Sequence, residues 1–275
     1  MRQATSLARL YAGSSARIFV RARRKRSRAG DGLIFIVGSP RSGTTFLARA
    51  LGEQPGIVDL GEVQPLKAAI PRLVALSRDS AAAQLRRILE LVRRLGGARR
   101  LRGVEQTPET AFVLEAALLA YPDARAVHLI RDGRDVVCSL LERGWLSATA
   151  HGTDDAGLPL GPHPRFWVEP ERRAEFRSTR DARRAAWAWR SYVAAARSVA
   201  DPRVLELRYE ELIGHPASAA EELAGGLSLD GTTLGASLSG ASTRSVGRWR
   251  TELAPEQLAD VEDEAGALLT ELGYG

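Results

Sequence analysis

Cysteine and lysine are nearly absent from this sequence of 275 residues. The single cysteine, Cys138, excludes an intrachain disulfide and any metal site built from several cysteines. It also suits a reducing compartment, so we expect a cytoplasmic protein. No apolar run approaches the roughly 20 residues that a membrane-spanning helix requires. The length is sufficient for one large domain with a substantial hydrophobic core.

Positive charge is carried almost entirely by arginine, because Lys25 and Lys67 are the only lysines. Residues 1–30 hold nine basic residues and no acidic one, which leaves 30 basic and 33 acidic residues in the remainder. We therefore divide the chain into a basic arm, residues 1–30, and a single domain, residues 31–275. A solvated, poorly ordered terminus is the favoured interpretation of the arm. The alternative is an amphipathic helix on an anionic membrane surface, using Leu7, Leu10, Tyr11, Ile18 and Phe19.

Short apolar runs and amphipathic segments alternate along the domain. We expect strands at residues 33–37, 57–60, 126–130 and 204–209. We expect helices at residues 45–51, 80–95, 107–120, 133–143, 181–199 and 255–272. Residues 144–180 are rich in Gly, Pro and His and predict a long loop. The alternation predicts an α/β fold, a three-layer P-loop-like domain with a central, mainly parallel sheet flanked by helices.

Several residues of types that often bind ligands are more simply explained as core residues. His128 lies inside an expected strand, and Cys138 lies on an expected helix. Trp187, Trp189 and Tyr192 share another expected helix. We expect all five side chains to be packed in the interior.

A loop similar to a phosphate-binding loop follows the first expected strand. The pattern G-x-x-x-x-G-K-[ST] is nearly satisfied by Gly38-Ser39-Pro40-Arg41-Ser42-Gly43-Thr44-Thr45. Glycines let the backbone N–H groups turn inward, and the N-terminus of the following helix favours an anion. Thr44 replaces the lysine that reaches the phosphates of a nucleoside triphosphate, which disfavours a kinase or an ATPase. The candidate ligands in this loop are Pro40, Arg41, Ser42, Gly43, Thr44 and Thr45.

A second set of candidate anion ligands begins where the strand at 126–130 ends. Arg131 lies at the carboxyl end of that strand, where parallel sheets bind their ligands. Ser139 and Arg143 share one face of the following helix, so the three residues are spaced to hold a single dianion. Surface salt bridging among the neighbouring charges is the alternative interpretation. Two such sites on one sheet edge imply a nucleotide with two separated phosphate groups.

The two motifs together resemble those of the PAPS-dependent sulfotransferases, and the resemblance extends from about residue 32 to residue 274. PAPS, 3′-phosphoadenosine 5′-phosphosulfate, carries a 5′-phosphosulfate and a separate 3′-phosphate. In that family the first loop binds the 5′-phosphosulfate, and an arginine and a serine eight residues apart bind the 3′-phosphate. The resemblance also implies donor contacts from Tyr209, Gly247 and Arg248. It implies an enzyme that uses PAPS, releases PAP and requires no metal.

The resemblance is nearer to the tyrosylprotein and other carboxylate-base branches than to the cytosolic branch with a histidine base. It places Glu62, behind Gly61, at the position of the catalytic base, and Arg41 beside the leaving phosphate. That branch has a lysine where this sequence has Gln106. Either Arg41 therefore acts alone, or another cation such as Lys67 enters the site.

The sequence leaves the acceptor open, because a hydroxyl group of a small molecule, a glycan or a lipid would each satisfy the chemistry. Two other functions also stay open. The first loop alone would suit a P-loop nucleotide kinase or NTPase, and Gln106 would suit a PAPS-binding protein with weak activity. The basic arm permits peripheral contact with a membrane, and we expect no specific binding of nucleic acid.

Overall fold

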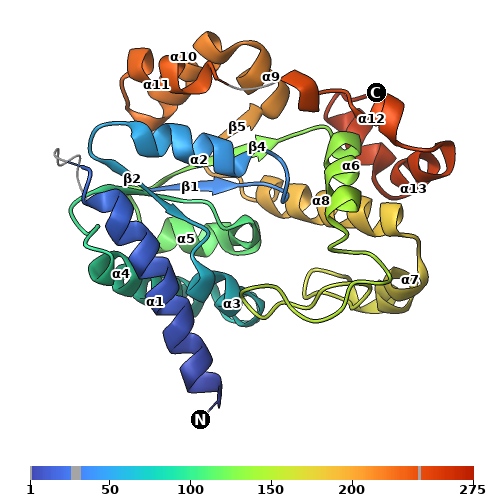
Figure 1. Ribbon diagram of the computed structural model, residues 1–275, viewed down its shortest axis with the longest axis horizontal. Helices are drawn as coiled ribbons and strands as arrows, with labels where there is room; N and C mark the ends of the chain where they lie inside the picture. Colours follow the sequence, from blue (N-terminus) through green and yellow to red (C-terminus); the bar gives the residue numbers. More distant parts are fainter. Residues whose placement is uncertain (1, 26–31, 241–242) are drawn as a thin grey trace.

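Five parallel strands form the centre of the molecule (Figure 1). The computed structural model describes residues 2–25, 32–240 and 243–275. The strands lie in the order β2-β3-β1-β4-β5, and every neighbouring pair is parallel. Their bounds are β1 Leu33–Val37, β2 Ile57–Gly61, β3 Arg102–Glu105, β4 Arg125–Ile130 and β5 Val204–Arg208. The predicted α/β fold, with a parallel sheet flanked by helices, is confirmed.

Alternating side chains of β1 supply the two hydrophobic layers of the core. Ile34 and Ile36 belong to one layer, and Leu33, Phe35 and Val37 belong to the other. All five side chains are fully buried, as expected for a central strand covered on both faces.

Helices cover both faces of the sheet and one of its ends (Figure 1). The layer on the side of Ile34 contains α2 Thr44–Glu53, α9 Tyr209–Gly214, α10 Pro216–Leu227 and α11 Gly231–Leu238. The opposite layer contains α1 Arg2–Ala22, α3 Gln64–Leu73, α4 Arg78–Leu95, the 3-10 helix η1 Pro108–Val113 and α5 Leu114–Ala120. A third cluster joins α6 Gly133–Arg143, α8 Asp181–Arg197 and α13 Pro255–Glu271. The short elements are η2 Pro170–Arg172, α7 Arg173–Ser178, η3 Thr243–Ser245 and α12 Trp249–Glu252.

The five residues expected in the interior are all buried. Each is at most 5% exposed: His128, Cys138, Trp187, Trp189 and Tyr192. The indole N–H of Trp189 donates to the carbonyl of Arg131 at 3.0 Å, so this core residue also fixes the end of β4.

The helix expected at residues 107–120 divides into η1 and α5. The cause lies in Glu105, whose carboxylate accepts hydrogen bonds from the N–H of Thr107 (2.8 Å) and the hydroxyl of Thr110 (3.0 Å). These bonds tie the first turn back to β3. The strand expected at 204–209 also ends one residue early, so Tyr209 begins α9 instead.

Helix α3 is absent from the sequence prediction because two prolines interrupt its pattern. Pro65 lies in the first turn, where a missing N–H leaves no hydrogen bond unmade. Pro71 lies near the end of the helix, only two residues before its last residue, Leu73. The helix therefore accommodates both.

Helix α1 packs on the sheet rather than standing free in solvent. Ser14 and Ile18 are buried on its inner side, where α1 contacts β2, α3 and α4. Arg21 forms an ion pair with Asp59 at 3.0 Å and donates to the carbonyl of the same residue. One side of α1 is thus buried in the core between Ser14 and Ala22, and the division of the chain into an arm and a domain stays a prediction.

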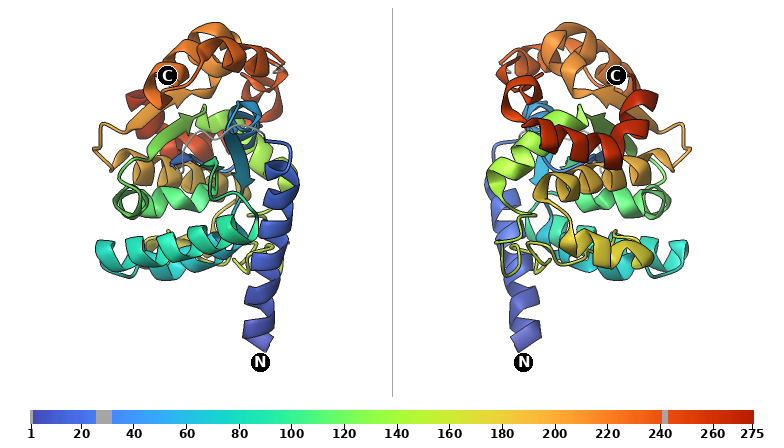
Figure 2. Two further views of the ribbon diagram at one scale, coloured as in Figure 1. Left: turned by 90° about the vertical axis from the view of Figure 1, so that its left-hand side faces the viewer. Right: turned by 90° about the vertical axis from the view of Figure 1, so that its right-hand side faces the viewer.

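The N-terminal half of α1 extends beyond the rest of the molecule (Figure 2). Leu7 and Phe19 are about half exposed, at 49% and 48%. Contact between this helix and a membrane surface stays a prediction. The expected boundary at residue 30 lies outside the described residues. Of the helices in the described part of the chain, none combines the length and the hydropathy needed to span a bilayer.

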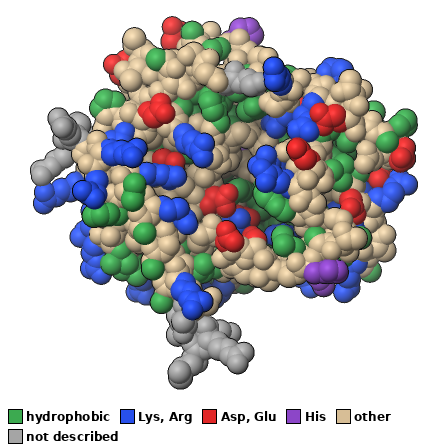
Figure 3. Space-filling model, in the orientation of Figure 1, with side chains coloured by type: hydrophobic (Ala, Val, Ile, Leu, Met, Phe, Trp, Pro, Cys, Tyr) green, Lys and Arg blue, Asp and Glu red, His purple; other side chains and the backbone are tan. Residues whose placement is uncertain are grey.

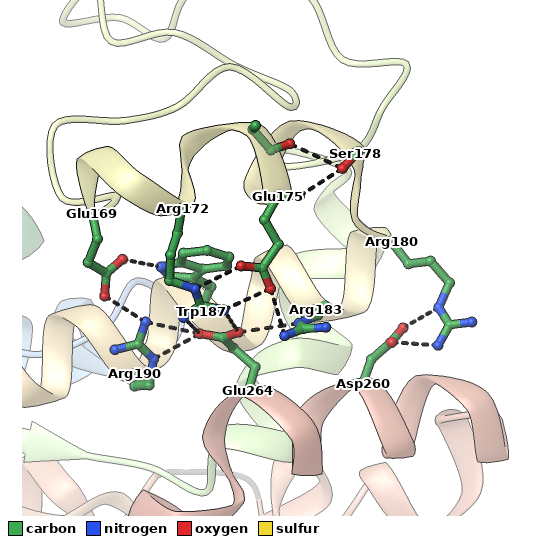
Figure 4. A network of polar contacts seen from close by, with 11 residues as sticks. Glu169, Arg172, Glu175, Ser178, Arg180, Arg183, Trp187, Arg190, Asp260 and Glu264 are labelled. Atoms are coloured by element: carbon green, nitrogen blue, oxygen red, sulfur yellow. Dashed lines mark hydrogen bonds and ion pairs between the residues drawn. The ribbon is translucent and has the colours of Figure 1, made fainter.

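The long loop between α6 and α8 is anchored at its far end by a network of ion pairs (Figure 4). Glu264 of α13 is almost fully buried, and it pairs with three arginines, Arg172, Arg183 and Arg190. Glu169 pairs with Arg190 at 2.9 Å and accepts a hydrogen bond from the indole of Trp187 at 2.8 Å. The loop predicted at 144–180 is thus largely irregular, with only η2 and α7 in it, yet its far end is fixed to two helices.

Candidate functional site

Every strand of the sheet is followed by a candidate site residue. The phosphate-like loop follows β1, and Glu62, Gln106, Arg131 and Tyr209 follow β2, β3, β4 and β5. Because the strands are parallel, their carboxyl ends meet at one edge of the sheet. This edge therefore gathers candidates that are distant in the sequence.

The loop between β1 and α2 lies close to two neighbouring segments. A Cβ atom on Gly43 would lie 2.5 Å from the ring of Tyr209, and one on Gly38 would lie 2.4 Å from the carbonyl oxygen of Leu129. Only glycine fits at these two positions. Arg41 has a φ angle of 73°, in the left-handed region that non-glycine residues seldom adopt. Strain of this kind concentrates at functional sites.

The start of α2 presents hydrogen-bond donors at the end of this loop. The helix begins at Thr44, so the N–H groups of Thr44 and Thr45 lie in its first turn and have no intrahelical partner. Ser42 is fully buried, and its hydroxyl has no hydrogen-bond partner among the described residues. Donors without acceptors at a helix N-terminus are suited to an anion.

The second motif meets the first directly. Arg41 Nε donates to Ser139 Oγ at 2.9 Å, across 98 positions of sequence. Arg131 donates to the carbonyl of Arg41 at 2.9 Å, and its guanidinium lies 4.8 Å from the ring centroid of Tyr209. Arg143, in the last turn of α6, is exposed and has no ion pair among the described residues.

A third segment, the late loop around Gly247, closes on the same residues. The hydroxyl groups of Tyr209 and Ser245 lie 2.9 Å apart, and Arg131 also donates to the carbonyl of Ser245. The buried carboxylate of Asp135 accepts from the N–H of Gly247 at 2.7 Å. Asp135 lies between Arg131 and Ser139, and Ser245 lies two residues before Gly247, but neither was predicted as a ligand from the sequence.

Arg248 differs from the other residues predicted to bind PAPS, because it has acidic partners. It pairs with Glu252 at 2.6 Å and with Glu142, at the end of α6, at 3.3 Å. Its guanidinium is therefore held by exposed carboxylates on α12 and α6 rather than by the first loop.

Positive charges crowd around Arg41. Burial lowers the pKa of its guanidinium, and the nearby charges of Arg143 and Arg131 lower it further. Arg131 is itself 5% exposed, and its Nε is buried without a hydrogen-bond partner among the described residues. Guanidinium groups that repel one another are stabilised by a multiply charged anion between them.

Glu62 stands beside Lys67, one of the two lysines of the chain. Its Oε2 lies 3.1 Å from Lys67 Nζ, and its side chain is 34% exposed. Lys67 is also 3.7 Å from Glu109 and 3.5 Å from Asp154. Burial alone would lower the pKa of Lys67, but the three carboxylates outweigh it and raise that pKa. Lys67 is therefore a permanent cation shared by three acidic residues.

Glu109 is a buried acid that was not predicted as a site residue, because its position is typical of the first turn of a helix. Burial raises its pKa, although the charge of Lys67 opposes the rise. Its Oε1 accepts a hydrogen bond from the hydroxyl of Tyr192 at 3.0 Å. The bond from Tyr192 thereby fixes Glu109 beside Lys67.

A cavity of about 500 Å³ adjoins the loop and this charged cluster. Arg41, Thr45, Glu62 and Lys67 are among the residues that line it. Its remaining walls come largely from the long loop and α8, through Trp145, Leu146, Asp154, Asp155, Leu160, Arg165, Trp167 and Tyr192. Figure 3 shows a hollow on this face with acidic and basic side chains gathered around it. The cavity therefore joins the loop between β1 and α2 to Glu62, the predicted base.

Gln106 lies within the site but contributes no charge. Its side-chain oxygen accepts a hydrogen bond from the hydroxyl of Thr45 at 3.3 Å. The structure thus places the side chain of Gln106 against the first turn of α2.

Comparison with known proteins places the chain in a family. The model of a sulfotransferase family matches residues 33–96 and 74–232, together more than half of the chain. The chain belongs to the sulfotransferase family. No curated protein sequence matches it significantly. The closer likeness to the carboxylate-base branch stays a prediction.

Solved structures share the fold at low sequence identity. The sulfotransferase domain from the curacin biosynthetic pathway is 18% identical, with a TM-score of 0.53 over 88% of this chain and 98% of that one. A sulfotransferase from Mycobacterium avium is 14% identical, with a TM-score of 0.53 over 88% and 76%. A mouse sulfotransferase crystallised with PAP is 18% identical, with a TM-score of 0.52 over 89% and 90%. These likenesses support the fold described above.

Proposed function

We propose that this sulfotransferase transfers the sulfuryl group of PAPS to a hydroxyl group of an acceptor held in the cavity. The observation that carries the proposal is the cluster of Arg41, Arg131 and Ser139, in which two anion-binding motifs meet beside a cavity that also contains Glu62. The mouse sulfotransferase with the same fold was crystallised with PAP, which supports the choice of donor.

The residues of this edge fit a donor with two phosphate positions. Pro40, Ser42, Gly43, Thr44 and Thr45 would hold the 5′-phosphosulfate with Arg41, and Arg131, Ser139 and Arg143 would hold the 3′-phosphate. The unpartnered polar atoms of Ser42 and Arg131 and the repulsion around Arg41 are the features that such a polyanion satisfies. Tyr209, Gly247 and Arg248 would complete the donor site from the late loop.

PAPS supplies an activated sulfuryl group bound to a phosphate oxygen. Arg41 and the N–H groups at the start of α2 stabilise the negative charge that grows on the leaving phosphate. Glu62 takes the proton of the acceptor hydroxyl, a contribution typically worth about 10²–10⁴-fold in rate. Glu62 and Arg41 line one cavity, so the base and the charge-stabilising group face the same bound acceptor.

Lys67 is the cation that we assign to the charged cluster in place of the family lysine. It lies 3.1 Å from Glu62 and also pairs with Glu109 and Asp154. It therefore orients the base. Because Lys67 is held by carboxylates, Arg41 remains the principal cation at the sulfuryl group.

Gln106 supports a second candidate function, binding of PAPS with only weak transfer. A neutral amide replaces a cation next to Thr45. Turnover measurements with PAPS distinguish the two candidates, because a binding protein would retain affinity for PAP and transfer no sulfuryl group under any acceptor condition.

The cavity volume fits one small acceptor or the end of a larger one. We propose a hydroxyl group of a small molecule, a glycan or a lipid as the acceptor.

Calorimetry with PAP in metal-free buffer is the first test, followed by an acceptor screen with labelled PAPS. We expect Arg131→Ala to weaken PAP binding by about tenfold or more, because it removes charge-assisted hydrogen bonds. We expect Glu62→Gln to keep PAP affinity and lose about 10²-fold or more in turnover. Glu115→Gln, on an exposed face of α5, is the matched control and should change neither. Unchanged turnover in Glu62→Gln would remove Glu62 from the role of base.

A further inference from the structure

Two hydrogen-bond donors on the loop wall of the cavity have no acceptor. Arg165 and Trp167 both line the cavity. The Nε of Arg165 and the indole Nε1 of Trp167 are buried atoms without a hydrogen-bond partner among the described residues. Trp167 is 9% exposed, and the Arg165 side chain forms no ion pair within the described part of the chain. Buried donors of this kind carry a desolvation cost until they are paired.

The acidic residues around this wall are already committed to other cations. In Figure 4, Arg172 of η2 and Arg183 and Arg190 of α8 surround the carboxylates of Glu169, Glu175 and Glu264. Glu62, Glu109 and Asp154, which also line the cavity, share Lys67. The chain thus supplies carboxylates to its other cations here and leaves Arg165 without one.

Two buried acceptors of the cavity, Oε2 of Glu109 and Oε1 of Gln64, also lack a hydrogen-bond partner among the described residues. Glu109 nevertheless lies 3.7 Å from the charge of Lys67, and the amide of Gln64 is neutral. Asp155 is exposed at the cavity rim and forms no ion pair among the described residues. An exposed carboxylate is hydrated and needs no counter-ion. The guanidinium of Arg165 is half-buried and forms no ion pair among the described residues, so it is the charged group of this wall that an anion would pair with.

We infer that the acceptor carries an oxyanion group, a carboxylate or a phosphate, in addition to its reacting hydroxyl, and that Arg165 and Trp167 bind it. The inference rests on the proposed function for the identity of the cavity as the acceptor site. Arginine is matched to both oxyanions through paired N–H donors, and the indole N–H supplies one further hydrogen bond. The aromatic rings of Trp167 and Tyr192, 6.0 Å apart, form an apolar wall for the body of the acceptor.

The binding experiment uses protein saturated with PAP and three probes that share one phenol ring. The probes are 4-hydroxyphenylacetate, (4-hydroxybenzyl)phosphonate and the neutral 4-hydroxyphenylacetamide. Calorimetry gives the affinities, and the indole N–H signal of Trp167 in a ¹H–¹⁵N spectrum, assigned by its loss in Trp167→Phe, reports the site. We expect at least one anion to bind about tenfold more tightly than the amide and to shift that signal. The better of the two anions identifies the oxyanion.

Variants of the loop wall test the assignment of the residues. Arg165→Met should abolish the preference for the anion while leaving PAP affinity unchanged. Arg177→Met, on the exposed face of α7, is the matched control and should keep the preference. Equal binding of anion and amide, a preference that survives Arg165→Met, or an unshifted Trp167 signal at saturation would each overturn the inference. Failure to bind PAP would instead refute the proposed function.

Discussion

Glu105 should make the stability of the protein depend on pH in a defined direction. The side chain is fully buried at the end of β3. Burial raises its pKa from the ordinary 4.5 to about 7, although the hydrogen bonds from Thr107 and Thr110 oppose the rise. Because the folded-state pKa is the higher one, the folded protein holds a proton that the unfolded chain releases between these values. Stability is therefore greatest below pH 4.5 as far as this group is concerned, and falls as pH rises toward 7.

The size of this effect follows from the shift. Each pKa unit corresponds to about 1.4 kcal/mol, so ionisation of Glu105 removes on the order of 3 kcal/mol from the free energy of unfolding. Glu105→Gln abolishes the titration while its amide oxygen still accepts from the N–H of Thr107, and the Thr110 hydroxyl can accept from the new amide. Burial also raises the pKa of other carboxyl groups, among them Glu109 and Glu210, so the informative quantity is the difference in stability between wild type and variant.

Urea unfolding at several pH values between 5 and 8 measures that difference. We expect the wild type to lose stability relative to Glu105→Gln by on the order of 3 kcal/mol across the titration. Glu115→Gln, which removes an exposed carboxylate of α5, should follow the wild type. Parallel curves for the wild type and Glu105→Gln would refute the reasoning.

Three further perturbations address the site and α1. Lys67→Met should lower turnover by about tenfold or more with PAP affinity kept, because the base loses its charged partner, and Lys67→Arg should restore part of the loss. Gly43→Ala should weaken PAP binding by about tenfold or more in calorimetry, because the new methyl group would meet the Tyr209 ring at 2.5 Å and push the loop out of place. Ile18→Ala should lower the free energy of unfolding, measured with urea, by about 2–5 kcal/mol, because the Ile18 side chain is fully buried. Phe19→Ala, at a half-exposed position, should change it by no more than about 0.5 kcal/mol. Equal effects of the two variants would mean that α1 does not pack as described.

The sequence was sufficient for the parts of the fold that depend on local patterns. The apolar runs of β1 and β4 and the loop after β1 are continuous segments, so their periodicity and turn residues identify them. The rule that ligands lie at the carboxyl ends of parallel strands then places Arg131 beside the loop, and the structure has it there, bonded to the carbonyl of Arg41.

The contacts within the charged cluster of the cavity could not be predicted from the sequence, because they join segments that are distant in it. Lys67 lies on α3, whose two prolines interrupt the helical pattern of the sequence. Glu109 lies in a first helical turn, where acidic residues are common. Asp154 and Arg165 come from an irregular loop with no periodicity. Only the folded chain shows that three of these residues meet and that Arg165 is left without a carboxylate.

The seating of α1 has a consequence for self-association. β2 is an edge strand of the sheet, and an edge strand has unpaired carbonyl and amide groups that can bind another extended chain. Arg21 occupies one such carbonyl, that of Asp59, and the body of α1 lies against the same strand. Removal of this helix would therefore uncover a template for intermolecular pairing, and shortened proteins that begin after it should aggregate through β2.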